Sequence, residues 1–143
     1  VRLARILNAF NRLDERVVFP MHPRTKQAAE GTGWTPSANV MVVAPQGYLD
    51  MVRLEASARV VLTDSGGVQK EAYWLGVPCV TMRDETEWVE TLEGGRNVLA
   101  GSDPDKIVAL GRAAGDVRPR PMTFDGDAPS HRIAAVITEK SWT

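Results

Sequence analysis

The sequence has 143 residues, of which 43% are hydrophobic and 24% charged, and its formal net charge is −1. This is the balance of one globular domain, and so small a net charge gives no electrostatic attraction for nucleic acid or acidic membranes. No apolar run approaches the roughly 18–20 residues that cross a bilayer, the N-terminus has no signal-peptide core, and the first residue is Val1, so we expect a domain cut from a longer protein.

The predicted elements alternate between helices and short strands. The first is an amphipathic helix, in which the apolar residues at helical spacing are Leu3, Ile6, Leu7, Phe10 and Leu13. Continuous apolar runs predict strands at residues 17–20, 40–43, 60–62, 79–82 and 97–99. Further helices are predicted at residues 46–58, 67–75 and 104–114, the last with Asp103 as N-cap, and residues 25–38 are predicted to form a loop with a partial helix.

This alternation predicts the α/β class with a doubly wound, Rossmann-like parallel sheet. The strands are apolar throughout, as expected when helices cover both faces of a sheet. Residues 118–129, rich in proline and glycine, are predicted to form a linker, and residues 130–143 a last helix that packs elsewhere. The single cysteine, Cys79, lies in an apolar run and is expected in the core, which excludes an internal disulfide and fits a reducing cytoplasm.

Polar residues follow three of the predicted strands, at residues 21–25, 63–67 and 83–87. In open parallel sheets, ligands bind outside the carboxyl ends of the strands. Independent surface loops have no reason to be polar at one edge of the sheet only. The coincidence therefore predicts a binding edge.

Ser65-Gly66-Gly67 leads from a predicted strand directly into a helix. Exposed N–H groups and the positive end of the helix dipole suit such a turn to a phosphate, and glycine lets the backbone approach the anion closely. The run is not a nucleoside-triphosphatase loop, because no Gly-Lys-Ser/Thr follows, and it lacks the third glycine of a dinucleotide fingerprint. A tight turn capped by serine is the alternative.

Three further side chains are candidates for nucleotide binding. Glu71 lies one turn after Gly67, where a carboxylate could accept hydrogen bonds from ribose hydroxyls, although a solvated first-turn glutamate is the alternative. His22 could act as a donor or acid beside a diphosphate, although a lone histidine is more often structural. Arg24 could add positive charge toward a phosphate. Together these residues predict a nucleotide- or phosphate-binding domain and leave the reaction type open.

Residues 62–72, Leu-Thr-Asp-Ser-Gly-Gly-Val-Gln-Lys-Glu-Ala, closely resemble a motif of the non-hydrolysing UDP-N-acetylglucosamine 2-epimerases. Residues 19–25, 45–49, 76–78 and 82–90 match further motifs of that family in the same order, so the resemblance covers roughly residues 1–137. It implies a GT-B-like fold of two domains with the active site in the cleft between them. Residues 1–143 would be the C-terminal, UDP-binding domain.

The resemblance implies an isomerase of nucleotide-sugar metabolism that serves cell-surface polysaccharide biosynthesis. Such enzymes eliminate UDP from UDP-N-acetylglucosamine to give a glycal, and re-addition of UDP to the glycal gives UDP-N-acetylmannosamine. The family implies a homodimer and neither a redox cofactor nor a metal. Its catalytic carboxylates belong to the N-terminal domain, so the present chain alone is expected to bind UDP weakly and to be inactive.

The resemblance also assigns roles to individual residues. Those expected to bind UDP are Ser65, Gly66 and Gly67 at the diphosphate, Glu71 at the ribose, and Gln46 and Met51 near the uracil. His22 matches the active-site histidine that contacts the departing phosphate. Trp88 stands where some members have arginine, and residues 124–127 depart from the family's aromatic-Gly-Asp-Gly signature, so neither receives a role. Trp88 and its charged neighbours are expected to form a solvated face with an aromatic staple.

Four alternatives stay open at this point. They are an epimerase of a related UDP-diacetamido sugar, a hydrolysing epimerase, a GT-B glycosyltransferase, and a nucleotide-sugar sensor that is not an enzyme. Hydrolysing epimerases tend to have a serine-rich loop in place of residues 64–67. The run at residues 64–71, with the His-Pro-Arg loop, favours the epimerase over the transferase.

Overall fold

The structure is a computed structural model that describes residues 2–114. The linker predicted at residues 118–129, the helix predicted within residues 130–143 and the signature at residues 124–127 lie outside the described residues. Within residues 2–114, no helix is long and apolar enough to span a membrane.

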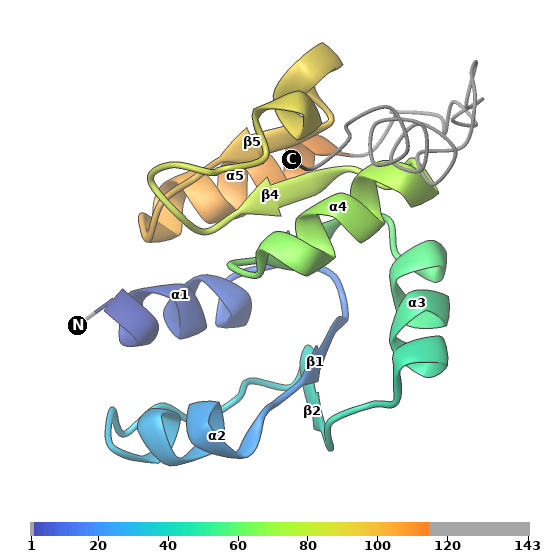
Figure 1. Ribbon diagram of the computed structural model, residues 1–143. Helices are drawn as coiled ribbons and strands as arrows, with labels where there is room; N and C mark the ends of the chain where they lie inside the picture. The colour runs from blue at the N-terminus through green and yellow to red at the C-terminus, as the bar shows by residue number, and fades with distance from the viewer. Residues whose placement is uncertain (1, 115–143) are drawn as a thin grey trace, which may run out of the picture.

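Helices and strands alternate along the described chain, as predicted (Figure 1). The helices are α1 Arg2–Asn11, α2 Pro23–Glu30, α3 Tyr48–Ser57, α4 Gly66–Leu75 and α5 Pro104–Ala113, together with the 3-10 helix η1 Val89–Gly95. The strands are β1 Val17–Pro20, β2 Val40–Val43, β3 Val61–Thr63, β4 Cys79–Thr81 and β5 Asn97–Leu99. Every pair that these strands form is parallel, which confirms the α/β class.

The strands are divided between two sheets. β1 pairs with β2, and the other sheet has the order β3-β4-β5. One face of the two-stranded sheet is left uncovered by residues 2–114, because Val18 and Met41, which pair and so share a face, are 41% and 47% exposed. In Figure 1, α3 stands beside this sheet, and its packing partner is α4. The expectation of two covered faces is therefore wrong for β1 and β2.

The core lies between the α1–α5 helix pair and strand β4. Leu7 of α1 and Ile107 of α5 are fully buried, and Val80 of β4 packs in the same cluster. Phe10 and Phe19 meet edge to face with ring centroids 5.3 Å apart, which joins α1 to β1. This cluster fixes the three-stranded sheet against the N-terminal helix.

A smaller cluster holds α4 on the sheet. Its buried members are Val61, Ala72, Val77 and Cys79. Cys79 is 2% exposed, as predicted for a core cysteine, and burial raises the pKa of its thiol to about 12. Helix α4 ends at Gly76, whose φ of 72° is the left-handed conformation that favours glycine at a helix C-terminus. The position of α4 over β3 and β4 places its N-terminus at the carboxyl edge of these strands.

Two local features differ from the sequence-based expectation. A loop with a partial helix was expected at residues 25–38, and α2 supplies that helix but begins two residues earlier, at Pro23, because proline suits the first helical position and His22 caps the helix through its side chain. The 3-10 helix η1 was not predicted. Asp103 does cap α5, with its carboxylate accepting from the backbone N–H groups of Asp105 and Lys106.

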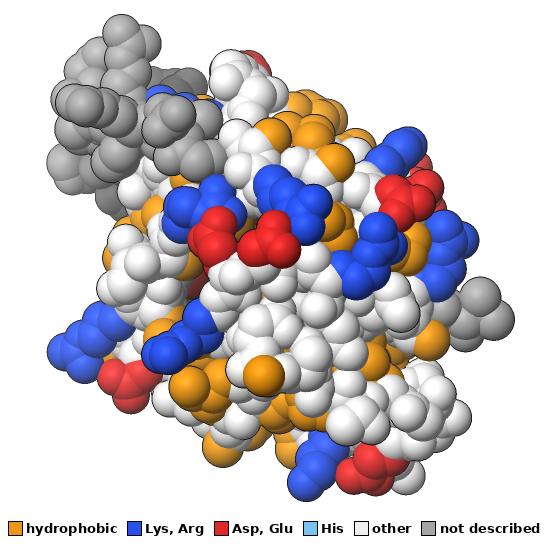
Figure 2. All heavy atoms as spheres, turned by 180° about the vertical axis from the view of Figure 1, so that it is seen from behind, with side chains coloured by type: hydrophobic (Ala, Val, Ile, Leu, Met, Phe, Trp, Pro, Cys, Tyr) orange, Lys and Arg blue, Asp and Glu red, His pale blue; other side chains and the backbone are white. Residues whose placement is uncertain are grey.

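Seen from behind, the molecule carries charges of both signs (Figure 2). Lys and Arg side chains are interspersed with Asp and Glu over the upper half of this face, and hydrophobic side chains gather at the lower end, where α2, β1 and β2 lie in Figure 1. The mixed charge on this face agrees with the small net charge of the sequence.

Candidate functional site

The parallel register brings two of the predicted polar loops to one edge of the three-stranded sheet. Thr63 at the end of β3 pairs with Thr81 at the end of β4. The backbone N–H of Met82 donates to the Thr63 carbonyl at 2.8 Å, so the loops after β3 and β4 start side by side. The third loop, at residues 21–25, follows β1 at the carboxyl end of the other sheet.

Helix α4 starts at this edge with its N-terminus open. Ser65 is the N-cap residue, but its side chain makes no capping hydrogen bond. Its backbone N–H instead donates to the Thr63 hydroxyl at 3.0 Å, which fixes the turn. Ser65 and Gly67 are exposed. First-turn N–H groups without a side-chain cap and the positive end of the helix dipole form a site suited to an anion.

Gly66 is required by packing against Trp88. A Cβ placed on residue 66 would lie 2.6 Å from the indole Nε1 of Trp88, which is closer than such contacts allow. At Gly67 a Cβ would meet only the Ser65 hydroxyl, at 3.7 Å. The absence of a side chain at residue 66 therefore has a cause besides approach to a phosphate.

Trp88 contacts Gly66 and Lys70, which lie one turn apart on α4. The Lys70 ammonium is 3.7 Å from the Trp88 ring centroid, a cation–π contact, and Gly66 faces the indole. Trp88 thus fastens the loop after β4 to the first turns of α4, which agrees with its interpretation as an aromatic staple. Nearby, Arg83 and Glu87 form an ion pair at 3.1 Å on the exposed side of the loop.

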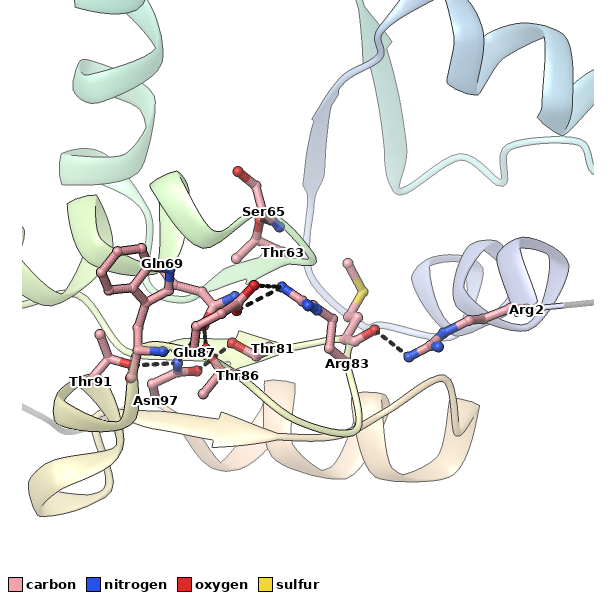
Figure 3. Close-up of polar contacts among 12 residues, drawn as sticks. Arg2, Thr63, Ser65, Gln69, Thr81, Arg83, Thr86, Glu87, Thr91 and Asn97 are labelled. Atoms are coloured by element: carbon pink, nitrogen blue, oxygen red, sulfur yellow. Dashed lines mark hydrogen bonds and ion pairs between the residues drawn. The ribbon is translucent and has the colours of Figure 1, made fainter.

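A buried polar network lies beneath this edge (Figure 3). Asn97 accepts a hydrogen bond from the Thr81 hydroxyl at 2.7 Å and donates to the Thr91 hydroxyl at 2.9 Å and to the Gln69 amide oxygen at 3.3 Å. Thr86 also donates to that Gln69 oxygen, at 2.7 Å. The network joins α4 to β4, β5, η1 and the loop after β4, so it fixes the position of the α4 N-terminus.

Sequence reasoning missed this network. The available signal was the presence of polar residues at positions of the predicted helix and strands that face the core. Gln69, Thr81 and Asn97 are 0%, 0% and 3% exposed. A buried amide or hydroxyl is retained only when hydrogen-bond partners are available. Gln69 and Thr86 lie within motifs of the family resemblance, but those motifs gave neither residue a role.

Glu71 lies one turn into α4 and is partly buried. The helix that packs against α4 is α3, and α3 presents a second carboxyl, that of Glu55, which is 2% exposed. Burial raises the pKa of Glu55 to about 7, with repulsion from Glu71 and the close approach of the two carboxyls adding to the effect. Sequence reasoning also missed Glu55, which lies within a predicted helix and outside any quoted motif.

The residues expected near uracil flank the start of α3. Gln46 is exposed, and its side-chain amide donates to the Ala44 carbonyl at 2.6 Å. Met51 is partly buried, one turn before Glu55 on the same face of α3. The structure thus brings Met51 and Glu71 onto two helices that pack together.

His22 and Arg24 lie at the start of α2 and are exposed. The His22 Nδ1 accepts from the backbone N–H of Arg24 at 3.2 Å, so His22 has a structural role as a helix cap. Within residues 2–114, no hydrogen bond joins either side chain to the α4 N-terminus. His22 and Arg24 follow β1 of the two-stranded sheet, whereas Ser65 follows β3 of the other sheet.

Comparison with known proteins identifies relatives for almost the whole chain. The sequence profile of the family described as UDP-N-acetylglucosamine 2-epimerase matches residues 1–138. A UDP-N-acetylglucosamine 2-epimerase homolog of Methanococcus maripaludis is 49% identical over 74% of the chain and 31% of its own length. The UDP-2,3-diacetamido-2,3-dideoxy-D-glucuronate 2-epimerase of Pseudomonas aeruginosa is 43% identical over 97% of the chain and 40% of its own length.

Solved structures give the same result. The Methanocaldococcus jannaschii UDP-GlcNAc 2-epimerase in complex with UDP-GlcNAc and UDP aligns with a TM-score of 0.83 and 33% identity, over 97% of this chain and 41% of that one. The chain therefore spans less than half the length of the relatives that it matches.

Proposed function

The chain belongs to the UDP-N-acetylglucosamine 2-epimerase family, and we propose that it forms the UDP-binding, C-terminal half of an enzyme that interconverts UDP-N-acetylglucosamine and UDP-N-acetylmannosamine. The observation that carries this proposal is the uncapped N-terminus of α4, which opens at the carboxyl edge of β3 and β4. In this family context, that N-terminus is the place for a diphosphate.

Each part of UDP has a proposed partner. Ser65, Gly66 and Gly67 hold the diphosphate through backbone N–H groups and the Ser65 hydroxyl. Glu71 accepts hydrogen bonds from the ribose hydroxyls. The uracil lies near Gln46 and Met51, at the start of the neighbouring helix α3.

The diphosphate site contributes to the reaction by stabilising the leaving group. When the bond between the anomeric carbon and the UDP oxygen breaks, negative charge grows on that oxygen, and fixed N–H dipoles at the α4 N-terminus favour this charge. His22 and Arg24 assist at the phosphate once the nucleotide brings the α2 start toward α4. The proton beside the anomeric carbon is taken by a carboxylate of the other domain. UDP then adds back to the anomeric carbon, and a proton is delivered to the opposite face of the carbon that bears the acetamido group, which inverts that carbon.

The proposal is tested by following turnover of UDP-N-acetylglucosamine in D2O with the full-length protein. NMR should show UDP-N-acetylmannosamine with deuterium at the carbon that bears the acetamido group. Free N-acetylmannosamine would identify a hydrolysing epimerase, and transfer to an acceptor would identify a glycosyltransferase. Tight binding without any conversion would identify a sensor.

A second substrate is favoured by one comparison. The chain is 43% identical, over 97% of its length, to a relative named for a UDP-diacetamido-glucuronate. Parallel assays with that sugar nucleotide and with UDP-N-acetylglucosamine decide between the two. The preferred substrate is the one with the higher kcat/KM.

A cytoplasmic homodimer completes the proposal. The buried thiol of Cys79, with no disulfide partner in the sequence, fits a reducing compartment. Sedimentation of the full-length protein measures the oligomeric state, and a monomeric mass would contradict the dimer.

A further inference from the structure

Glu55 is a buried carboxyl without a hydrogen-bond partner. It is 2% exposed, and neither of its oxygens is hydrogen-bonded within residues 2–114. In the described part of the chain, the one other buried side-chain atom without a hydrogen-bond partner is Nε2 of Gln69, whose amide oxygen accepts two hydrogen bonds. An ionised carboxylate in such a place is costly, so the group must hold a proton or gain a partner.

The charged groups around Glu55 give it no cation. Glu71 of α4 is the carboxyl that acts on it most, and the Cys79 thiol of β4 also lies within its influence. On its own helix, Arg53 is paired with Asp50 at 3.0 Å on the exposed side. On α4, Lys70 lies over the Trp88 ring. Glu55 thus faces another carboxyl without an ion pair of its own in the described part of the chain.

Its protonation state follows from these surroundings. Burial, and then the Glu71 carboxylate, raise the pKa of Glu55 to about 7. Below neutral pH, Glu55 is therefore a hydrogen-bond donor beside Glu71. A protonated carboxyl beside a carboxylate makes a short and strong hydrogen bond, whereas two carboxylates repel each other.

We propose that Glu55 is a positioning residue for the ribose site: its protonated carboxyl donates a hydrogen bond to one Glu71 oxygen when nucleotide binds, and this directs the other Glu71 oxygen toward the ribose hydroxyls. The inference rests on the proposed binding of ribose by Glu71. Met51 lies one turn before Glu55 on the same face of α3. This face therefore carries both the residue proposed to lie near the uracil and the carboxyl proposed to position Glu71.

The proposal predicts that the contribution of Glu71 to UDP affinity depends on pH. The test is a double-mutant cycle in the full-length protein, with UDP affinity measured by calorimetry at pH 6 and pH 9. The contribution of Glu71 is the ratio of the Kd of Glu71→Ala to that of the parent protein, in which titration of the UDP phosphate cancels. We expect this ratio to be about tenfold at pH 6, the effect of a hydrogen bond to a charged group, and to approach one at pH 9.

The variant Glu55→Gln separates positioning from packing. Its amide donates as protonated Glu55 does but does not titrate, so the Glu71 ratio should stay about tenfold at both pH values. In Glu55→Leu, which fills similar space without a donor, the ratio should be low at both. If a Glu55 substitution only perturbed packing, it would change the UDP affinity with and without Glu71 by the same factor, and the Glu71 ratio would not depend on pH.

The possible outcomes distinguish this inference from the proposed function. A Glu71 ratio of one at pH 6 would show that Glu71 does not bind the nucleotide, which overturns the ribose assignment and the role of Glu55 but leaves the proposed diphosphate site. A ratio above one that is equal at pH 6 and pH 9 would keep the ribose assignment and overturn the role of Glu55. A pH dependence that persists in Glu55→Gln would also overturn it.

Discussion

The indole of Trp88 occupies the space that a side chain at Gly66 would need, with Nε1 only 2.6 Å from an ideal Cβ at residue 66. Two motifs that are 22 positions apart in the sequence are therefore one structural unit. The glycine pair at the start of α4 combines two requirements, since Gly66 makes room for the indole and Gly67 keeps the helix N-terminus accessible.

Replacing Gly66 by alanine should destabilise the fold, because the added methyl group forces Trp88 away from α4 and from Lys70. We expect a loss of about 1–3 kcal/mol in the free energy of unfolding, as for other overpacked sites. The matched control is Gly67→Ala, where the nearest side-chain atom is 3.7 Å away. Urea unfolding measures both, and equal stability of the two variants would contradict the packing assignment.

Removing the Asn97 side chain should cost about 3 kcal/mol, because Asn97→Ala leaves the buried Thr81, Thr91 and Gln69 groups short of partners. The matched control is Val98→Ala on the same strand, where the side chain is 36% exposed. Thermal unfolding measures both variants. A loss no larger for Asn97→Ala than for Val98→Ala would show that the network contributes little.

The stability of the fold should depend on pH through Glu55. The folded state holds a proton on Glu55 up to about pH 7, whereas the unfolded chain releases it near 4.5. The free energy of unfolding therefore falls as pH rises through this window and is level above it. The shift corresponds to about 3 kcal/mol.

Glu55→Gln does not titrate, so its stability relative to the parent protein should rise by about that amount from pH 4 to pH 8. Urea unfolding at several pH values measures the difference. The control is Glu93→Gln, since Glu93 is exposed and should show no such trend. Parallel curves for Glu55→Gln and the parent would contradict the buried, protonated state.

His22 has an observed role as a helix cap and a proposed role at the phosphate. His22→Asn keeps a capping acceptor, whereas His22→Ala loses it and should cost about 1 kcal/mol of stability. If the imidazole also acts at the phosphate, both variants should lower kcat of the full-length protein to a similar extent. Full activity in His22→Asn would limit His22 to capping.

The sequence predicted most of the elements, because their signals are local. The apolar runs give β1, β2 and β5 at the observed residues, and the Asp103-Pro104 pair marks the start of α5. The partial helix expected within residues 25–38 begins earlier, at Pro23, because the polar composition of residues 21–25 conceals a proline at the first helical position. The exposed face of β1 and β2 was missed because an apolar strand does not say what lies against it.

The candidate site likewise has a part that local sequence signals predict and a part that they do not. The strand-end argument anticipated the α4 N-terminus, since it needs only the order of strands and helices. Glu55 and Asn97 could not be predicted, because their importance depends on residues from other elements. A glutamate in a helix is usually solvated, and only the packing of α3 on α4 makes Glu55 buried.

The most direct test of the central claim is an NMR titration of the full-length protein with 15N-labelled glycine. UDP should shift the amide signals of Gly66 and Gly67 at the proposed diphosphate site and of Gly47 beside the proposed uracil site, while uridine should shift Gly47 alone. Gly111 of α5, distant in the chain from these turns, serves as the control and should not move. Saturable UDP binding that leaves Gly66 and Gly67 unchanged would contradict the claim that the α4 N-terminus holds the diphosphate.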